Sequence, residues 1–312
     1  MTIGTKPPIQ LPSGYFLDFS GPALVMAIVN CNEDSFYAPS RALREQAVEK
    51  ALQAEEDGAS IIDFGAESSR PGSSYVCEEE ELRRLIPVVK AFREQSPLPV
   101  SVDTRKAAVA RSALDAGADI INDISALSDD PGMAGLCAER GAAVVLMHKQ
   151  GIPLTMQDAP RYGDLFAEID AFLSEAAQRA VAAGISPEKI IIDPGIGFGK
   201  RLEDNLEILR RIACFGRLPR LAEICGKDYP VLIGLSRKSF IGEIIGRQNS
   251  SRRIAARLST ASDAEDRLSG TLAANGVAIM GGADIIRVHD VKEHMDLVKM
   301  LFALRAESSL GK

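Results

Sequence analysis

Eight short runs rich in β-branched residues recur along the chain, and this repeat limits the possible folds more than any other feature. The runs are ALVMAIVN (23–30), ASIIDFGA (59–66), LPVSVDT (98–104), ADIINDIS (118–125), AAVVLMHK (142–149), IIIDPGIG (190–197), PVLIGLSR (230–237) and ADIIRVHDV (283–291). The segments between them have helical periodicity and often end in a glycine signal. Apolar strands that alternate with helices indicate a parallel sheet covered on both faces. The repeat predicts an α/β (β/α)8 TIM barrel, with a doubly wound open sheet as the alternative.

The composition is that of a globular protein, because 46% of the 312 residues are hydrophobic and this suffices for a large core. No linker divides the chain, so we expect a single domain over residues 1–312, in which residues 1–22 form an extension before the first barrel strand. The amino terminus lacks signal-peptide character and no apolar run is long enough to span a membrane, which favours a cytoplasmic protein without a membrane partner.

Charge and cysteine usage exclude further classes. The formal net charge of -7 argues against nucleic acid as a partner, since binding to phosphate backbones needs a positive field. The five cysteines are scattered and form no C-x-x-C pair, which argues against a disulfide framework or a structural zinc site. Any anionic substrate must therefore be bound by a local cluster of cations.

Polar residues follow every predicted strand. They are Asn30, Glu67, Ser68, Asp103, Asn122, Asp123, His148, Asp193, Ser236, Arg237, Lys238, Arg287 and His289. The carboxyl ends of the strands of a parallel barrel meet on one face, where active sites of such barrels lie. One such residue alone is more often a helix cap or a turn residue. The whole set predicts a single shared pocket.

The segment IIIDPGIGFGK (190–200) is the most glycine-rich of these strand ends. Its G-x-G-x-G spacing differs from the dinucleotide fingerprint, and Lys200 is followed by Arg201 where a phosphate P-loop has Ser or Thr. Glycine at this density lets a backbone adopt positive φ or approach another group closely. The local pattern therefore indicates a buried strand followed by a functional loop, without identifying the ligand.

Taken in order, the motifs resemble those of the dihydropteroate synthase family of pterin-binding barrels. They are IVNCNEDSF, DFGAESSRPGS, SVDTRKAAVA, INDIS, LMHKQG, DPGIGFGK, GLSRKSFIG and RVHDV, and they extend from about residue 23 to residue 300. The resemblance implies condensation of 6-hydroxymethyl-7,8-dihydropterin diphosphate with 4-aminobenzoate to give 7,8-dihydropteroate and pyrophosphate in folate biosynthesis. It also implies a homodimer and a sulfonamide target.

The resemblance assigns the pterin-binding positions to Asp103, Asn122, Met147, Asp193 and Lys238. A carboxylate offers two acceptors, which match the amino and ring N–H donors of a pterin, and Asp193 is the expected partner of that edge. The glycines after Asp193 are expected to keep side chains away from the ring. Met147 could instead be an ordinary barrel-core residue, and so could Phe198.

The diphosphate is expected to contact Asn30, Arg70, Arg287 and His289. Arginine suits forked phosphate recognition, and Arg287 and His289 are two residues apart, so both project to the same side of their strand. The family uses Mg²⁺, which favours oxygen ligands and keeps several waters. Asn30 is the expected protein ligand of this metal, bridged to the diphosphate.

Catalysis is expected to involve Asp34, Arg70 and Lys238, by ionisation of the pterin to a delocalised cation that the amine of 4-aminobenzoate attacks. The expected aminobenzoate-binding residues are Ser69, Pro71, Phe198 and Ser239. Ser239 begins the helix after the seventh strand, where its hydroxyl and the helix amino terminus can bind a carboxylate. As an alternative, Ser239 is only a helix cap.

Two segments depart from the family pattern. The first loop reads NCNEDSF where the family commonly has N-V-T-P-D-S-F, and SSRPG replaces S-T-R-P-G, so that Ser69 lacks a methyl group. These departures leave two alternatives: a non-catalytic homologue that binds pterin, or a pterin-dependent methyltransferase of the same superfamily. The methyltransferase has no need of SSRPG, SRKS and RVHD together, so these basic motifs favour the synthase.

Overall fold

The strands predicted from the sequence form a parallel barrel. The computed structural model describes residues 6–31, 40–67, 73, 75–152, 154–220, 228–250 and 267–307. The barrel strands in this part of the chain are β3 (Leu24–Asn30), β4 (Ile61–Gly65), β5 (Val100–Asp103), β6 (Ile120–Asp123), β7 (Ala143–Met147), β8 (Ile190–Asp193), β9 (Leu232–Gly234) and β10 (Ile285–Val288). They are adjacent in the order β8-β7-β6-β5-β4-β3-β10-β9, and a bridge between Ile192 and Val231 joins the two edge strands. The predicted TIM barrel is confirmed, and the open-sheet alternative is wrong.

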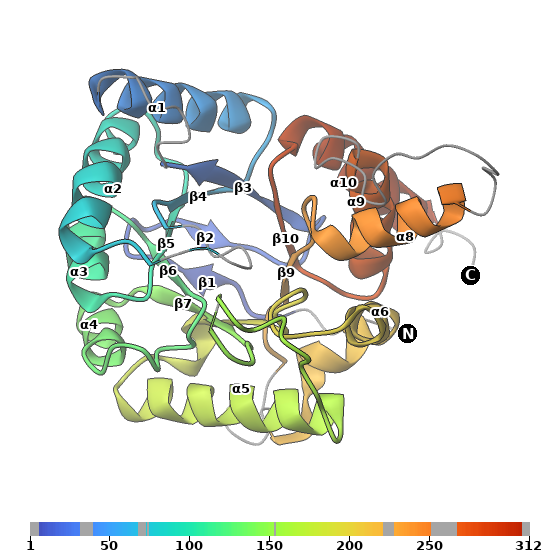
Figure 1. Cartoon of the computed structure of the whole chain (residues 1–312). Coiled ribbons are helices and arrows are strands. Elements are labelled where there is room, and N and C mark those ends of the chain that lie inside the picture. The colour runs from blue at the N-terminus through green and yellow to red at the C-terminus, as the bar shows by residue number, and fades with distance from the viewer. Residues whose placement is uncertain are drawn as a thin grey trace.

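Helices surround the strands, as Figure 1 shows. They are α1 (Ser40–Glu56), α2 (Glu78–Arg93), α3 (Ala107–Asp115), α4 (Met133–Arg140), α5 (Leu165–Ala182), α6 (Leu202–Arg210), α8 (Ser239–Ser250), α9 (Leu268–Met280) and α10 (Val291–Glu307). The 3-10 segments are η1 (Pro187–Lys189) and η2 (Ile212–Arg217). No helix within the described residues combines the length and apolarity required to cross a membrane.

Side-chain alternation divides the apolar residues between two cores. On β4, Ile62 and Phe64 point outward, and Phe64 packs edge-on against Phe92 of α2 with 5.6 Å between ring centroids. Ile61 points into the barrel, where it joins a separate apolar cluster. Full burial of one such side chain contributes about 1.5–3 kcal/mol. Because alternate residues of a strand face opposite sides, Asp63 must also face the barrel interior.

A hairpin that the sequence analysis did not predict lies in the extension before the first barrel strand. It consists of β1 (Ile9–Gln10) and β2 (Phe16–Leu17), paired antiparallel. Ile9, Leu11 and Leu17 are buried in the inner apolar cluster, together with strand residues such as Ile61. The hairpin therefore packs against the amino end of the barrel interior, which leaves the carboxyl end for a polar site.

Candidate active site

Along β4, β6, β8 and β10, an apolar inward-facing side chain is followed two residues later by a polar one that faces the same way. Ile61 is followed two residues later by Asp63, and the same step occurs at Ile120 and Asn122, at Ile191 and Asp193, and at Ile285 and Arg287. Residues two apart on a strand point the same way and lie about 7 Å apart. The polar residues predicted to share a pocket at the carboxyl end are thus brought together by strands far apart in the sequence.

Arg287 lies between two carboxylates from neighbouring strands. Its Nε donates to Asp63 Oδ2 at 2.6 Å, and its Nη2 donates to Asp103 Oδ2 at 2.9 Å. Asn122 Nδ2 also donates to Asp63 Oδ2, at 3.3 Å. Burial raises the pKa of Asp103 to about 7, although the nearby guanidinium of Arg287 opposes this shift. The predicted diphosphate residue Arg287 therefore lies among the predicted pterin residues Asp103 and Asn122.

Asp63 is a site residue that the sequence analysis missed. It is fully buried in β4, and its Oδ1 has no hydrogen-bond partner among the residues that the structure describes. The sequence analysis considered only the polar residues that follow each strand. The sequence did contain a signal for Asp63, because it is a charged residue inside an apolar run and lies on the same side of its strand as the residues that face the barrel interior. Burying a carboxylate is too costly to occur without a partner or a function.

Asp193, Lys238 and Phe198 form the opposite wall of the site. Asp193 Oδ1 accepts from the backbone N of Gly195 at 2.7 Å, and burial raises the pKa of this carboxyl. Lys238 Nζ lies 4.5 Å from the ring centroid of Phe198 and donates to the carbonyl of Ile196. Burial lowers the pKa of Lys238 to about 8. Met147 is the register partner of Asp193 and is buried beside it.

Two glycines of DPGIGFGK have a packing role besides the one expected. A Cβ on Gly195 would lie 1.8 Å from the carbonyl oxygen of His148, and a Cβ on Gly199 would lie 2.2 Å from that of Gln150. Both glycines have positive φ, at 67° and 63° respectively. Two adjacent loops therefore pack backbone to backbone, and this packing requires glycine whether or not a pterin ring is bound.

The buried ammonium of Lys200 joins the same two loops. It donates to the carbonyls of Gly195 at 2.9 Å and Phe198 at 3.2 Å, and its Nζ lies 2.8 Å from His148 Nδ1. Burial lowers the pKa of Lys200 to about 7 and holds that of His148 well below its usual range. The His148 ring also packs edge-on against Phe172 of α5, with 5.0 Å between centroids. His148 was expected to face the shared pocket, but it contributes to packing instead.

Other strand-end residues also have structural partners. Asp123 accepts from the backbone N of Ser125 at 2.7 Å and from that of Leu127 at 3.0 Å, so it closes a turn. The guanidinium of Arg237 pairs with Asp290. Asp123 is therefore a turn residue, which is what a single polar residue at a strand end most often is.

The remaining predicted site residues lie near the mouth of the barrel or outside the described part of the chain. Asn30 ends β3 and is exposed, and Ser239 is the exposed first residue of α8. His289 Nδ1 lies 2.8 Å from Ser236 Oγ. Four residues fall outside the described ranges: Asp34, Ser69, Arg70 and Pro71.

The structure offers one candidate oxygen ligand for the expected metal. Among the described residues, no group of three or more His, Cys, Asp or Glu side chains could bind a metal ion. Asn30 offers an exposed amide oxygen at the mouth of the barrel. Mg²⁺ commonly binds through one or two protein oxygens together with substrate phosphates and waters, so a single oxygen ligand is compatible with it.

Comparison with known proteins places this geometry in a family context. A family model described as "Pterin binding enzyme" matches residues 26–289. Dihydropteroate synthase from Escherichia coli (strain K12) is 43% identical over 291 residues, which cover 93% of this chain and 94% of that protein. The matched segment includes every inward-facing polar residue described above.

Two solved structures are similar over nearly the whole chain. The Yersinia pestis dihydropteroate synthase with a sulfonamide drug has a TM-score of 0.83 and 37% identity, and the match covers 96% of this chain and 100% of that chain. The Burkholderia cenocepacia dihydropteroate synthase complexed with 7,8-dihydropteroate has a TM-score of 0.83 and 36% identity, with 98% of this chain and 99% of that chain covered.

Proposed function

This chain belongs to the pterin-binding enzymes, as a member of the dihydropteroate synthase family, and on that premise we propose the reaction that it catalyses. It condenses 6-hydroxymethyl-7,8-dihydropterin diphosphate with 4-aminobenzoate to form 7,8-dihydropteroate and pyrophosphate. The observation that carries this proposal is the inward-facing cluster at the carboxyl end of the barrel. Its carboxylates Asp63, Asp103 and Asp193 lie with the cations Lys238 and Arg287.

The buried carboxylates suit a flat heterocycle with several N–H donors. Asp193 has one oxygen bonded to Gly195 and accepts from the amino and ring N–H groups of the pterin. Asp103 and Asn122 bind the other edge of the ring, while Lys238 donates to a pterin acceptor. Because Asp103 has a raised pKa, it can also donate a hydrogen bond near neutral pH. Met147 packs on the ring.

The reaction breaks the C–O bond between the pterin methylene group and the diphosphate. The electron pair leaves with pyrophosphate, and the positive charge spreads into the pterin ring. The amine nitrogen of 4-aminobenzoate then forms the new C–N bond and releases a proton. This chain needs no strong nucleophile for these steps, so its residues act by positioning the substrates and by neutralising the leaving group.

The leaving group is bound by Asn30, Arg70 and His289, and Arg287 adds positive charge from within the barrel. Mg²⁺ is the proposed cofactor; Asn30 would hold it beside the diphosphate, where the metal would neutralise phosphate charge. Asp34 lies in the first loop and stabilises the pterin cation. The aminobenzoate is bound by Ser69, Pro71, Phe198 and Ser239.

We also propose that the protein forms a homodimer, is located in the cytoplasm and is inhibited by sulfonamides. Exposed apolar side chains occur on the neighbouring helices α9 and α10, and they support self-association through these helices. They are Val277, Met280, Met300 and Leu304. An extended apolar surface on a monomer marks an interaction site more often than chance.

One assay tests the central proposal. Purified protein is incubated with pterin diphosphate and 4-aminobenzoate, with and without Mg²⁺, and 7,8-dihydropteroate is measured by mass spectrometry. We expect product that depends on both substrates and on the metal. If pterin diphosphate binds but no product forms, the protein is the non-catalytic binder. Neither a methyl donor nor a methyl acceptor is needed for the expected product, which separates it from the methyltransferase.

A further inference from the structure

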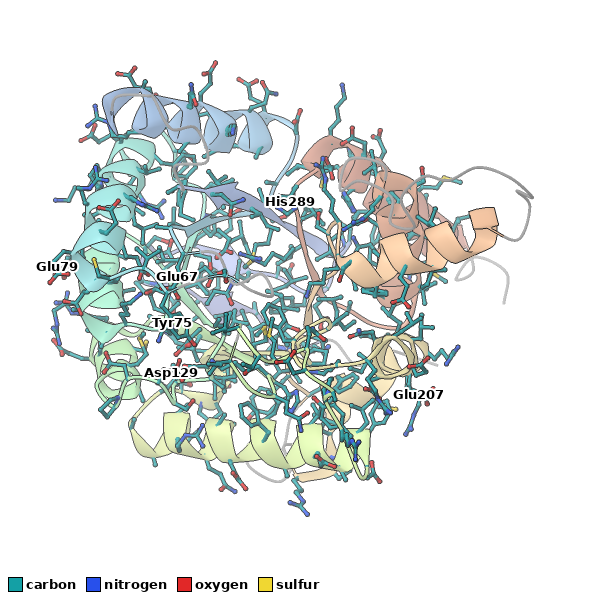
Figure 2. The ribbon with its side chains drawn as sticks, in the orientation of Figure 1. Glu67, Tyr75, Glu79, Asp129, Glu207 and His289 are labelled. Carbon is teal, nitrogen blue, oxygen red and sulfur yellow. The ribbon has the colours of Figure 1, made fainter. Side chains whose placement is uncertain are left out.

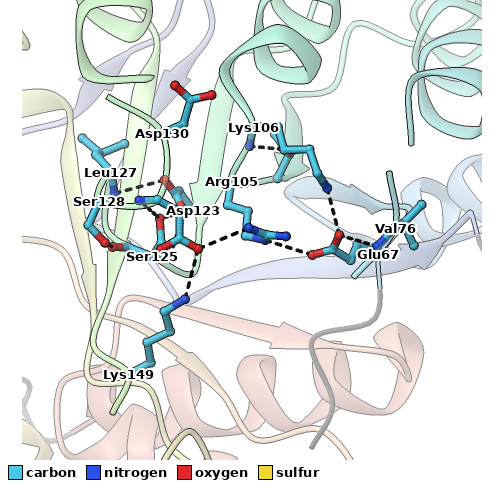
Figure 3. A network of polar contacts seen from close by, with 12 residues as sticks. Glu67, Val76, Arg105, Lys106, Asp123, Ser125, Leu127, Ser128, Asp130 and Lys149 are labelled. Atoms are coloured by element: carbon cyan, nitrogen blue, oxygen red, sulfur yellow. Dashed lines mark hydrogen bonds and ion pairs between the residues drawn. The ribbon is translucent and has the colours of Figure 1, made fainter. Parts of the chain in front are cut away.

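An ionic network runs along the carboxyl-terminal rim of the barrel and joins the connections that follow four neighbouring strands. Lys106 contacts Glu81 of α2 and lies 2.8 Å from Glu67, and Glu67 is 3.1 Å from Arg105. Arg105 reaches Asp129 at 3.4 Å, and Asp129 reaches Lys149 at 3.5 Å. Figure 3 shows this sequence of contacts from Lys149 to Lys106. The network therefore links the connections after β4, β5, β6 and β7 to one another.

Glu67 is the central residue of this network. Its Oε2 accepts from the backbone N of Val76 at 2.9 Å, so the carboxylate also joins the two ends of the connection between β4 and α2. Burial opposes ionisation of Glu67, but the contacts with Lys106, Val76 and Arg105 outweigh it and lower the pKa of the carboxyl. The side chain is 10% exposed. A carboxylate with two cations and a backbone donor is held in one position, and loss of its charge would leave, among the described residues, Lys106 paired only with Glu81 and Arg105 paired only with Asp129.

Arg105 adds a second contact with the same connection. Its guanidinium lies 3.5 Å from the ring centroid of Tyr75, next to Val76 in the chain. Such a contact combines cation–π attraction with stacking. Figure 2 shows Glu67, Tyr75 and Asp129 inside the ring of helices, whereas Glu79 projects outward from α2. Arg105 and Lys106 come two and three residues after Asp103, so the network joins the connection after β4 to the pterin side of the site.

We propose that Glu67, through Arg105 and Lys106, is a positioning residue that fixes both ends of the connection between β4 and α2 for the condensation step. This inference rests on the proposed function, because that connection carries Ser69, Arg70 and Pro71. Asp103 itself is held separately by Arg287. Loss of Glu67 should therefore impair use of 4-aminobenzoate and departure of the diphosphate far more than pterin binding.

The main test is Glu67→Gln, which keeps the shape of the side chain and removes its charge. We expect kcat/KM for 4-aminobenzoate to fall by about 10-fold or more, because small displacements of positioning groups are costly. The Kd of 6-hydroxymethyl-7,8-dihydropterin, which lacks the diphosphate that Arg70 is proposed to bind, should change by less than about 3-fold in calorimetry. A general loss of structure would instead reduce the binding-competent fraction and affect both ligands. Unchanged kinetics, or an equal loss for both ligands, overturns the proposal.

Glu80→Gln is the matched control. Glu80 also pairs with two cations, Arg83 at 2.6 Å and Arg84 at 2.5 Å, but these contacts lie within α2 and do not reach the connection. It removes the same charge from the same region and should leave the aminobenzoate kinetics unchanged. Tyr75→Leu is a milder second variant, because Tyr75 is 45% exposed and its loss should not prevent folding. It should impair kcat/KM for 4-aminobenzoate in the same direction, by a smaller factor than Glu67→Gln.

Two further measurements separate this proposal from the proposed function. If Arg105 acts through Glu67, Arg105→Gln combined with Glu67→Gln should be no worse than the more impaired single variant, whereas additive losses contradict the linkage. Hydrogen exchange of the peptide that includes Val76 requires no activity. Faster exchange in Glu67→Gln, but not in Glu80→Gln, supports the anchoring role even if the wild type forms no dihydropteroate. Equal exchange in wild type and Glu67→Gln overturns it.

Discussion

The two ends of the barrel are built from the same strands, yet they have opposite chemistry. At the amino end, Ile61 and Ile191 pack against the hairpin residues Ile9 and Leu17. Two residues further along β8, Asp193 faces the polar site. A single alternation step of about 7 Å thus separates a layer that contributes stability from one that binds ligand. Substitutions at the amino end should therefore change stability, whereas substitutions at the carboxyl end should change ligand binding or catalysis.

The largest effect is expected from Asp193→Asn, which should abolish pterin binding and leave the fold intact. The amide presents an N–H donor to a pterin donor, and the unpaired buried groups should cost about 3 kcal/mol or more. Calorimetry with pterin diphosphate checks this. Ile191→Val, on the same inward face, is the control: it should cost about 0.5–1.5 kcal/mol of stability and keep pterin affinity. Unchanged affinity in Asp193→Asn would remove this residue from the site.

Leu17→Ala should produce the reverse result at the amino end. Leu17 is 1% exposed, so truncation leaves a cavity and should lower the free energy of unfolding by about 2–5 kcal/mol. Steady-state kinetics at a temperature where the variant is folded should match those of the wild type. Phe16→Ala is the neighbouring control, because Phe16 is 53% exposed and should matter little. A large loss of kcat in folded Leu17→Ala would show that the two ends are coupled.

Asp34→Ala sharpens the comparison within the carboxyl end, because it separates chemistry from binding. A carboxylate beside the developing pterin cation stabilises the transition state more than the bound substrate. We expect kcat to fall by about 100-fold, while the Kd of pterin diphosphate stays nearly constant. Glu33→Gln in the same loop is the control and should keep most activity. If wild type and Asp34→Ala both bind pterin diphosphate and neither turns over, the protein is a binder.

The smallest effect concerns pH. Burial raises the pKa of Asp103 to about 7 in the folded protein, whereas an aspartate in the unfolded chain titrates near about 4. Between these values the folded state holds a proton that the unfolded state has lost, so the free energy of unfolding falls as pH rises. Asp103→Asn removes this dependence. Its stability relative to wild type, from urea unfolding, should therefore be higher at pH 8 than at pH 4. An equal difference at both pH values would contradict the raised pKa.

Local patterns were sufficient for the barrel strands, because burial on both faces imposes a continuous apolar run that can be read without neighbours. They were insufficient for the hairpin of the extension. Its strands have two residues each, too few for periodicity, and they are stable only because Ile9 and Leu17 are covered by the barrel.

The sequence by itself determined the eight-strand repeat and the polar character of the strand ends, since these depend on residues close together in the chain. Only the tertiary structure decided which polar residues meet. Asp63 and Arg287 are 224 residues apart and form an ion pair because barrel closure makes β3, β4 and β10 neighbours. The same closure turned His148 away from the pocket and made Gly195 obligatory, because a Cβ at this position would clash with the His148 carbonyl of the neighbouring loop. Contacts of this kind depend on strand order and register, which no local pattern encodes.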